Sequence, residues 1–348
     1  MPLPNLPVPS PRVSRWSRNV PPRRVRQVLA ATILLISIPI VTMLQADSGY
    51  GIIEPGPVVR LTEAVSGPDV LDPSPTSGWF AFTTVEVSEL SYLDLIEDRL
   101  STRAAVKLSP TAFSKEARAQ MIESKETASV LAYALARKQE FTSSGAMVLS
   151  VLKGSPAALA GVEPGDVITA FAAASVDSPT ALRSALAAAP VSSPLTVSRK
   201  GEVLKLTVSP VSGRIGVAVS PSYAAALDGL LELDTGSVGG PSAGLLLTLA
   251  TIDALSPGDL TAGLRIAGTG TIDSEGNVGP ISGIKFKAAA AEAAGTQWFF
   301  APVELQDEIP VSLKIKVVPV STLTDALTQL CDAGATDAIC TTTQEVSA

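Results

Sequence analysis

Histidine is absent from this chain of 348 residues, and aromatic residues make up only 4% of it. The missing histidine excludes a Ser-His-Asp triad and every metal site that depends on imidazole ligands. With few aromatics, alanine, valine and leucine must fill the interior, since 46% of the residues are hydrophobic. A serine nucleophile in this chain would therefore need a different base, and lysine is the first candidate.

Basic residues are scarce outside the first 27 positions. Residues 1–27 contain six arginines, seven prolines and no acid, which is typical of a disordered segment. The remainder has 20 basic residues against 33 acidic ones, a net charge of −13. Phosphate contact needs clustered lysine and arginine, so we predict no nucleic-acid partner.

An uncharged run of twenty residues follows, from Gln27 to Ala46, with its apolar centre between Val28 and Leu44. This is close to the ~20 residues that a spanning helix needs. Arginines precede the run and acids follow it, so the positive-inside rule predicts a cytoplasmic N-terminus and an extracytoplasmic body at the cell membrane. The alternative is a cleaved signal peptide and a secreted protein, although Leu44-Gln45-Ala46 is a poor cleavage site.

The only cysteines are Cys331 and Cys340, close to the C-terminus. On an exported body they would close a short loop as a disulfide. Two unpaired thiols in a mobile tail are the alternative.

Strand and helix patterns are mixed along the body, which predicts an α/β (α+β) fold. A β-branched and aromatic run at 79–87 indicates a strand, and residues 114–138 indicate one long helix or two short ones. Residues 142–211 form a compact block in which a strand at 146–151 precedes the motif Ser-Pro-Ala-x-x-Ala-Gly-Val-x-Pro-Gly-Asp-Val-Ile.

That motif and the order of elements around it resemble a PDZ domain of the type associated with bacterial proteases. The resemblance implies a β-sandwich or barrel-like domain with a groove beside the strand at 146–151, where a peptide would add as a further strand. The residues expected to bind peptide are Ser144, Gly145, Ala146, Met147 and Val148. The alternative is a small β-domain kept for structure alone.

Ser242 stands in Gly239-Gly240-Pro241-Ser242-Ala243-Gly244, ahead of an apolar run that predicts a buried helix. Unpaired N–H groups and the positive end of the helix dipole at such a place can stabilise an oxyanion. On this motif alone, an N-capping serine in a tight turn is the simpler interpretation.

Two lysines, Lys285 and Lys287, follow the turn Gly279–Gly283, and at most one can face a given site because they lie about 200° apart on a helix. A lysine base needs its pKa lowered from about 10.4 toward 7–8 by burial. Here the chain resembles the Lon-type proteases, whose nucleophile stands in Gly-Pro-Ser-Ala-Gly. The family's spacing after Pro280-Ile281-Ser282-Gly283-Ile284 selects Lys287, and a Thr-Gly pair matches Thr269-Gly270.

The order of anchor, PDZ and Lon-type domain is similar to the membrane-anchored, PDZ-containing Lon-like serine proteases of Gram-positive bacteria. The resemblance implies Ser242 as nucleophile, Lys287 as base, Thr269 as a hydrogen-bond partner of the amine, and oxyanion donors at Gly240 and Ser242 beside Pro241. It predicts no metal and no cofactor; because the sequence has no Gly-x4-Gly-Lys-[Ser/Thr] motif, no ATP-driven unfolding is expected.

The predicted organisation has six parts: an arm (1–27), a transmembrane signal-anchor (28–46), an N-terminal segment packing on the protease domain (47–141), a PDZ domain (142–211), a Lon-type domain (212–333) and a tail (334–348). The predicted function is that of an ATP-independent serine endopeptidase acting on exported or unfolded proteins, with a ring-shaped homo-oligomer expected by analogy. The alternative is a non-catalytic, membrane-tethered scaffold whose PDZ domain binds peptides.

Overall fold

The computed structural model describes residues 46–71, 78–94, 106–107, 110–188 and 192–341, together with 22–25, 27, 32, 35, 37, 42 and 43; for 47, 106–107 and 110–114 it describes the backbone alone. The chain divides into two units, residues 1–50 with 89–103 and residues 51–88 with 104–348. The predicted arm, the predicted membrane helix and the end of the predicted tail lie largely outside the described residues. Within the part that is described, no helix has the length and hydropathy that a membrane crossing requires.

The first sheet has the strand order β16-β15-β12-β3-β1-β4. Its strands β3, β12, β15 and β16 are parallel, with Phe80 opposite Ile266 and Ile266 opposite Trp298. The bounds are β1 Asp47–Arg60, β3 Trp79–Ser91, β4 Val106–Lys107, β12 Arg265–Gly268, β15 Trp298–Pro302 and β16 Lys316–Val320.

Successive residues of β12 and β15 point to opposite faces of the sheet and enter two different cores, each of which includes a helix. Ile266 and Phe300 belong to the core around α7 (Gly244–Leu255), whereas their neighbours Ala267 and Phe299 belong to the core around α8 (Ile284–Ala293). Almost every residue of α7 is buried, which confirms the buried helix predicted after Ser242.

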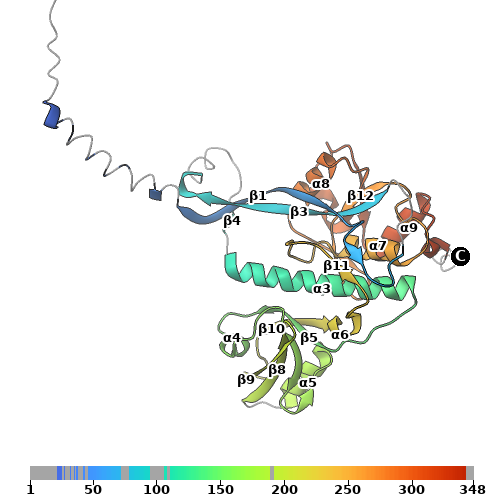
Figure 1. The fold of residues 1–348 in the computed structure, drawn as a ribbon, viewed down its shortest axis with the longest axis horizontal. Helices are drawn as coiled ribbons and strands as arrows, with labels where there is room; N and C mark the ends of the chain where they lie inside the picture. The colour runs from blue at the N-terminus through green and yellow to red at the C-terminus, as the bar shows by residue number, and fades with distance from the viewer. Residues whose placement is uncertain are drawn as a thin grey trace, which may run out of the picture. The chain divides into compact units, whose positions relative to one another are not determined.

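Residues 110–136 form one helix, α3 (Pro110–Ala136), which packs along α7 (Figure 1). Its Met121, Ala128 and Ala132 enter the same core as α7. Together with β1 and β3, α3 makes the segment before the PDZ block an integral part of the first sheet and its core.

The PDZ block forms a second sheet of order β10-β5-β6-β8-β9, with β7 paired to β6. Strand β10 (Val217–Ser222) pairs with β5 (Gly145–Val151), so the predicted boundary between residues 211 and 212 is wrong: the sheet continues to Ser222. The Ser144 N–H donates to the Ser222 carbonyl at 2.9 Å. The PDZ block is therefore an insert whose first and last residues adjoin.

The remaining elements are short. They are β2 Val65–Ser66, α4 Pro156–Leu159, β6 Val167–Phe171, β7 Ala174–Ser175, α5 Pro179–Ala188, β8 Ser193–Arg199, β9 Glu202–Val208, α6 Ala224–Leu227, β11 Glu232–Leu233, β13 Thr271–Ile272, β14 Val278–Gly279, the 3-10 helix η1 Val303–Glu308 and α9 Leu323–Asp332.

A disulfide joins Cys331, at the end of α9, to Cys340. It closes a loop of nine residues, for which chain-entropy arguments give about 2–3 kcal/mol. We expect the variant with Cys331→Ser and Cys340→Ser to lose about that much free energy of unfolding, measured by urea titration. Reduction of the wild type should have the same effect and leave the double variant unchanged; equal stability of oxidised and reduced protein would contradict this.

Candidate active site

Ser242 lies in the tight loop between Val238 and the start of α7. Gly240 has a φ of +94°, a left-handed conformation that favours glycine, and a Cβ at Gly244 would come within 2.9 Å of the Ser124 Oγ. Because α7 begins at Gly244, Ser242 stands two residues before the first helical residue. The loop thus presents the serine at the positive end of a buried helix.

Lys287 lies on the buried face of α8, which begins after Gly283. Its side chain is only 3% exposed and shares that face with Ile284 and Ala288. Lys285 is exposed, and its Nζ lies 4.9 Å from the centroid of the Phe286 ring. The helical register thus turns Lys287, and not Lys285, inward.

The structure brings Ser242, Lys287 and Thr269 together. The Lys287 Nζ donates to the Ser242 Oγ at 2.7 Å and to the Thr269 Oγ1 at 3.1 Å. The fully buried Thr269 donates its own hydroxyl to the Ser242 carbonyl at 3.0 Å, and the Gly270 N–H donates to the same carbonyl at 2.9 Å. Thr269 and Gly270 therefore fix both the amine and the backbone of the serine.

Burial lowers the pKa of Lys287 to about 8, because an ammonium loses solvation in this apolar surrounding. About a tenth of the amine is then neutral at pH 7 and about half at pH 8, and the neutral amine has a lone pair to accept the hydroxyl proton of Ser242. The arrangement can activate a serine without histidine.

A cavity of about 370 Å³ opens beside Ser242 and Lys287. Its lining includes Ser242, Lys287 and Val238, together with Met121 of α3 and Thr84 of β3. Such a space admits a substrate segment next to the serine hydroxyl.

The oxyanion donor expected at Gly240 is engaged elsewhere. The Gly240 N–H donates to the Ala117 carbonyl of α3 at 2.7 Å, so in this conformation it does not face the cavity. Pro241 has no N–H, and its carbonyl accepts from the Ser124 hydroxyl at 3.3 Å. Among the described residues the N–H of Ser242 has no acceptor, so in this state it is available as an oxyanion donor.

The prediction of a peptide groove beside residues 144–148 is wrong. Strand β5 pairs with β10 on one edge and with β6 on the other, so no peptide strand can add beside Ser144, Gly145, Ala146, Met147 and Val148. A strand adds only to an open edge.

The second sheet ends at β10 on one side and at β9 on the other, so β10 has an open edge. A groove of about 450 Å³ lies between β10 and α5, lined by Leu182, Leu186, Val217 and Val219 and by the turn at 212–216. Both Gly213 and Gly216 have positive φ, and the Ile215 carbonyl accepts from the Ala157 N–H at 2.9 Å. The Ser-Pro-Ala segment thus supports the turn; the signal missed in the sequence was Gly-x-x-Gly ahead of a β-branched strand.

Glu126 of α3, which sequence reasoning also missed, is a buried carboxylate near the end of β10. It accepts the Tyr223 N–H at 2.5 Å, at the start of α6. Burial raises its pKa to about 7, because the charged form is poorly solvated there.

This shift predicts that stability falls as pH rises. The Glu126 carboxyl binds its proton more tightly in the folded protein than in the unfolded chain. The protonated carboxyl therefore adds to the free energy of unfolding below pH 4.5, and this contribution is lost as the pH rises to about 7. Through Glu126, the wild type should lose on the order of 2 kcal/mol of its free energy of unfolding between pH 5 and pH 8, and we expect Glu126→Gln not to show this loss. Denaturant titration at the two pH values measures it.

Asp253 acts in the same direction, because burial raises its pKa to about 6, so some slope should remain in the variant. The exposed Glu202, changed to Gln, is the control and should keep the full slope. An unchanged slope in Glu126→Gln would show that this carboxyl titrates normally.

Two segments of the chain match known protein families. Residues 147–199 match the PDZ domain family, and residues 232–332 match the Lon protease (S16) C-terminal proteolytic domain. A Lon protease of Syntrophomonas wolfei is 39% identical over 93 residues, 25% of this chain and 11% of that protein. A Lon protease of Lawsonia intracellularis is 36% identical over 104 residues, 28% of this chain and 12% of that protein. The chain thus spans about an eighth of the length of these relatives, and the match is to a serine peptidase domain.

Proposed function

We propose that this protein is an ATP-independent, membrane-anchored serine endopeptidase that hydrolyses exported or unfolded proteins. The distance of 2.7 Å between the Lys287 Nζ and the Ser242 Oγ, at an amine whose pKa is lowered to about 8, carries the proposal. The match of the surrounding segment to a Lon-type proteolytic domain supports peptide-bond hydrolysis as the reaction.

In the first half of the reaction, the neutral Lys287 amine takes the hydroxyl proton while the Ser242 Oγ attacks the scissile carbonyl carbon. The Ser242 N–H, at the positive end of α7, stabilises the oxyanion of the tetrahedral intermediate. The Lys287 ammonium then returns the proton to the departing amine, and an acyl ester on Ser242 remains.

In the second half, Lys287 takes a proton from a water that attacks the ester, and then protonates the Ser242 Oγ as the acid product leaves. Thr269 serves both halves, because its hydroxyl accepts from the amine and donates to the Ser242 carbonyl. It holds the amine toward the serine in each protonation state.

Substitution of Ser242 by alanine tests the proposal. The purified full-length variant should lose hydrolysis of an unfolded protein such as reduced casein, with no ATP present, and Mg-ATP should leave the wild-type rate unchanged. Cleavage at the parent's rate by Ser242→Ala would instead favour a non-catalytic scaffold that only binds peptides.

The groove between β10 and α5 is the proposed site for peptide recognition. Its open strand edge supplies backbone hydrogen-bonding groups and its apolar walls suit an apolar side chain. The turn at 212–216 is the place for a terminal carboxylate, since successive backbone N–H groups in such turns bind anions.

Membrane anchoring, with the N-terminus in the cytoplasm and the catalytic body outside, is supported by the arginine-rich residues 1–27 and the uncharged run after them. Fractionation, protease protection of intact cells and N-terminal sequencing test it, because a cleaved signal peptide would leave a new N-terminus after residue 46. Light scattering of the detergent-solubilised chain tests the proposed ring assembly.

A further inference from the structure

Helix α3 holds the loop that carries the nucleophile at two points. The Ala117 carbonyl accepts the Gly240 N–H at 2.7 Å, and the buried Ser124 hydroxyl donates to the Pro241 carbonyl at 3.3 Å. These contacts hold the two residues immediately before Ser242. Any displacement of α3 therefore acts directly on the geometry of the nucleophile.

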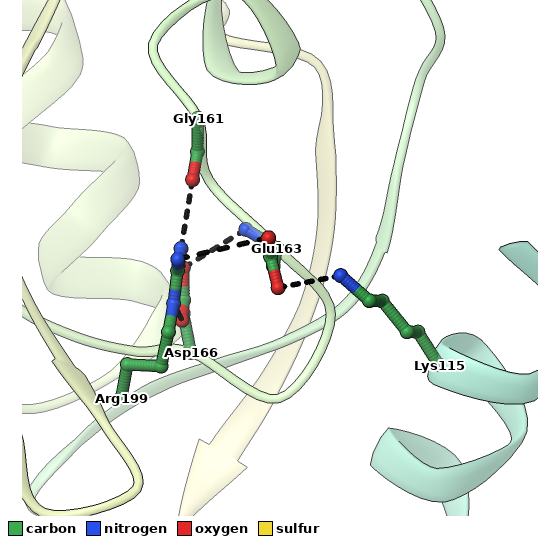
Figure 2. Close-up of polar contacts among 5 residues, drawn as sticks. All are labelled: Lys115, Gly161, Glu163, Asp166 and Arg199. Atoms are coloured by element: carbon green, nitrogen blue, oxygen red, sulfur yellow. Dashed lines mark hydrogen bonds and ion pairs between the residues drawn. The ribbon is translucent and has the colours of Figure 1, made fainter.

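The same helix packs against β5 and β10 of the PDZ insert, and it makes two polar contacts, one with the insert and one with the residue that directly follows it. Each lies on α3 two residues from one of the contacts to the loop of Ser242. Lys115 forms an ion pair with Glu163 at 2.8 Å, and Glu126 accepts the Tyr223 N–H at 2.5 Å. Figure 2 shows Lys115 reaching Glu163, which lies in one polar network with Arg199, Asp166 and Gly161.

The second of these polar contacts adjoins the strand that borders the peptide groove. Tyr223 directly follows β10, the strand with the open edge, and the Tyr223 N–H is the group that Glu126 accepts. A peptide that adds to β10 extends the ladder of this strand and so acts on the residue that Glu126 holds. The Glu126 side chain is buried, and dense packing leaves a buried side chain few alternative positions.

We propose that α3 couples occupancy of the groove between β10 and α5 to the loop of Ser242. In the state described here, the Gly240 N–H is bound to Ala117 and cannot serve an oxyanion. Peptide in the groove shifts α3 and releases this N–H, which adds a second oxyanion donor and raises kcat. The inference rests on the proposed endopeptidase function, since it concerns the regulation of that site.

The ligand can have this effect only if it binds the released state more tightly than the resting one. The test uses the full-length chain and a hexapeptide with a C-terminal leucine and a free carboxylate; the same peptide with a C-terminal amide is the control. The substrate is an internally quenched peptide with an amidated end, so that it does not compete for the groove. We expect the free-acid peptide to raise kcat at least about fivefold with KM unchanged, within the range of typical coupling.

Variants at Glu126 separate coupling from folding. Glu126→Leu removes the acceptor while keeping an apolar, buried side chain, and should bind the peptide without the rise in kcat. Glu126→Gln keeps an acceptor for the Tyr223 N–H and should restore the response. Lys115→Ala should weaken the response, whereas Lys153→Ala, at an exposed lysine of the same insert, should not change it.

Hydrogen exchange gives a readout that does not depend on cleavage. In the segment 238–244, exchange of the Gly240 amide should accelerate when the free-acid peptide binds, and should not respond in Glu126→Leu. If the wild type cleaves no substrate, the proposed endopeptidase function is wrong. Hydrogen exchange of the Gly240 amide would still show whether peptide binding is coupled to the loop of Ser242. Absence of peptide binding, unchanged exchange, or an equal rise in kcat in Glu126→Leu would each overturn the inference.

Discussion

Replacement of Lys287 by alanine is expected to lower kcat for peptide hydrolysis by about 10⁴-fold or more, since removing one member of a catalytic unit costs nearly as much as removing all. The reason is that the chain has no histidine, and among the described residues the Ser242 Oγ is hydrogen-bonded to the Lys287 Nζ alone, at 2.7 Å, so Lys287 is the group that can take its proton. Lys287→Arg should be equally inactive, because a guanidinium stays protonated. The measurement is single-turnover hydrolysis of a quenched peptide by each purified variant.

Lys285→Ala is the matched control. This lysine is two residues away on the same helix, is exposed, and should keep its activity within about twofold, as surface substitutions usually do. Loss of activity in Lys285→Ala with retention in Lys287→Ala would mean that the helical register assigned to the base is wrong. Circular dichroism of both variants excludes unfolding as the cause of any loss.

The pH profile of kcat/KM is expected to rise by about 50-fold from pH 6 to pH 8. The neutral amine is the active form, and burial places the pKa of Lys287 at about 8, so the active fraction grows nearly tenfold per pH unit below that value. Hydrolysis of the quenched peptide is measured over pH 5.5–9.5 at constant ionic strength, and kcat/KM reports the free enzyme.

A flat profile between pH 6 and pH 8 would show that no amine titrates in the reaction. Thr269→Val provides a comparison, because it removes the hydroxyl that accepts from Lys287 without removing the amine. Its profile should keep the same shape at a lower rate, since the principal cause of the lowered pKa is burial and not that hydrogen bond.

The close approach of Lys287 to Ser242 could be predicted from the sequence because the signals for both residues are local. The loop at 239–244 and the turn before α8 are each fixed by a few glycines and prolines, and counting along the family motif selects Lys287 without knowledge of the sheet. The 25 residues at 114–138 have no glycine or proline, so their helical character could also be predicted, although the pattern left one long helix and two short ones open.

The position of the peptide groove could not be read in this way. Which strand lies at the edge of a sheet depends on pairing between segments far apart in the chain, and β10 pairs with β5 across some seventy residues. Local pattern identified β5 as a strand but could not show that both its edges are covered. The contact between Ala117 and Gly240 joins segments more than 120 residues apart and carries no sequence signal at all.

The short span between Ser144 and Ser222 has a consequence for how such a chain can arise and be re-engineered. Since entry and exit of the insert lie one hydrogen bond apart, a tight turn could close the host without stretching either neighbour. A different peptide-binding domain with adjoining termini could then be inserted at the same junction. The resulting hydrolases would share one catalytic domain and differ in the peptides that they bind.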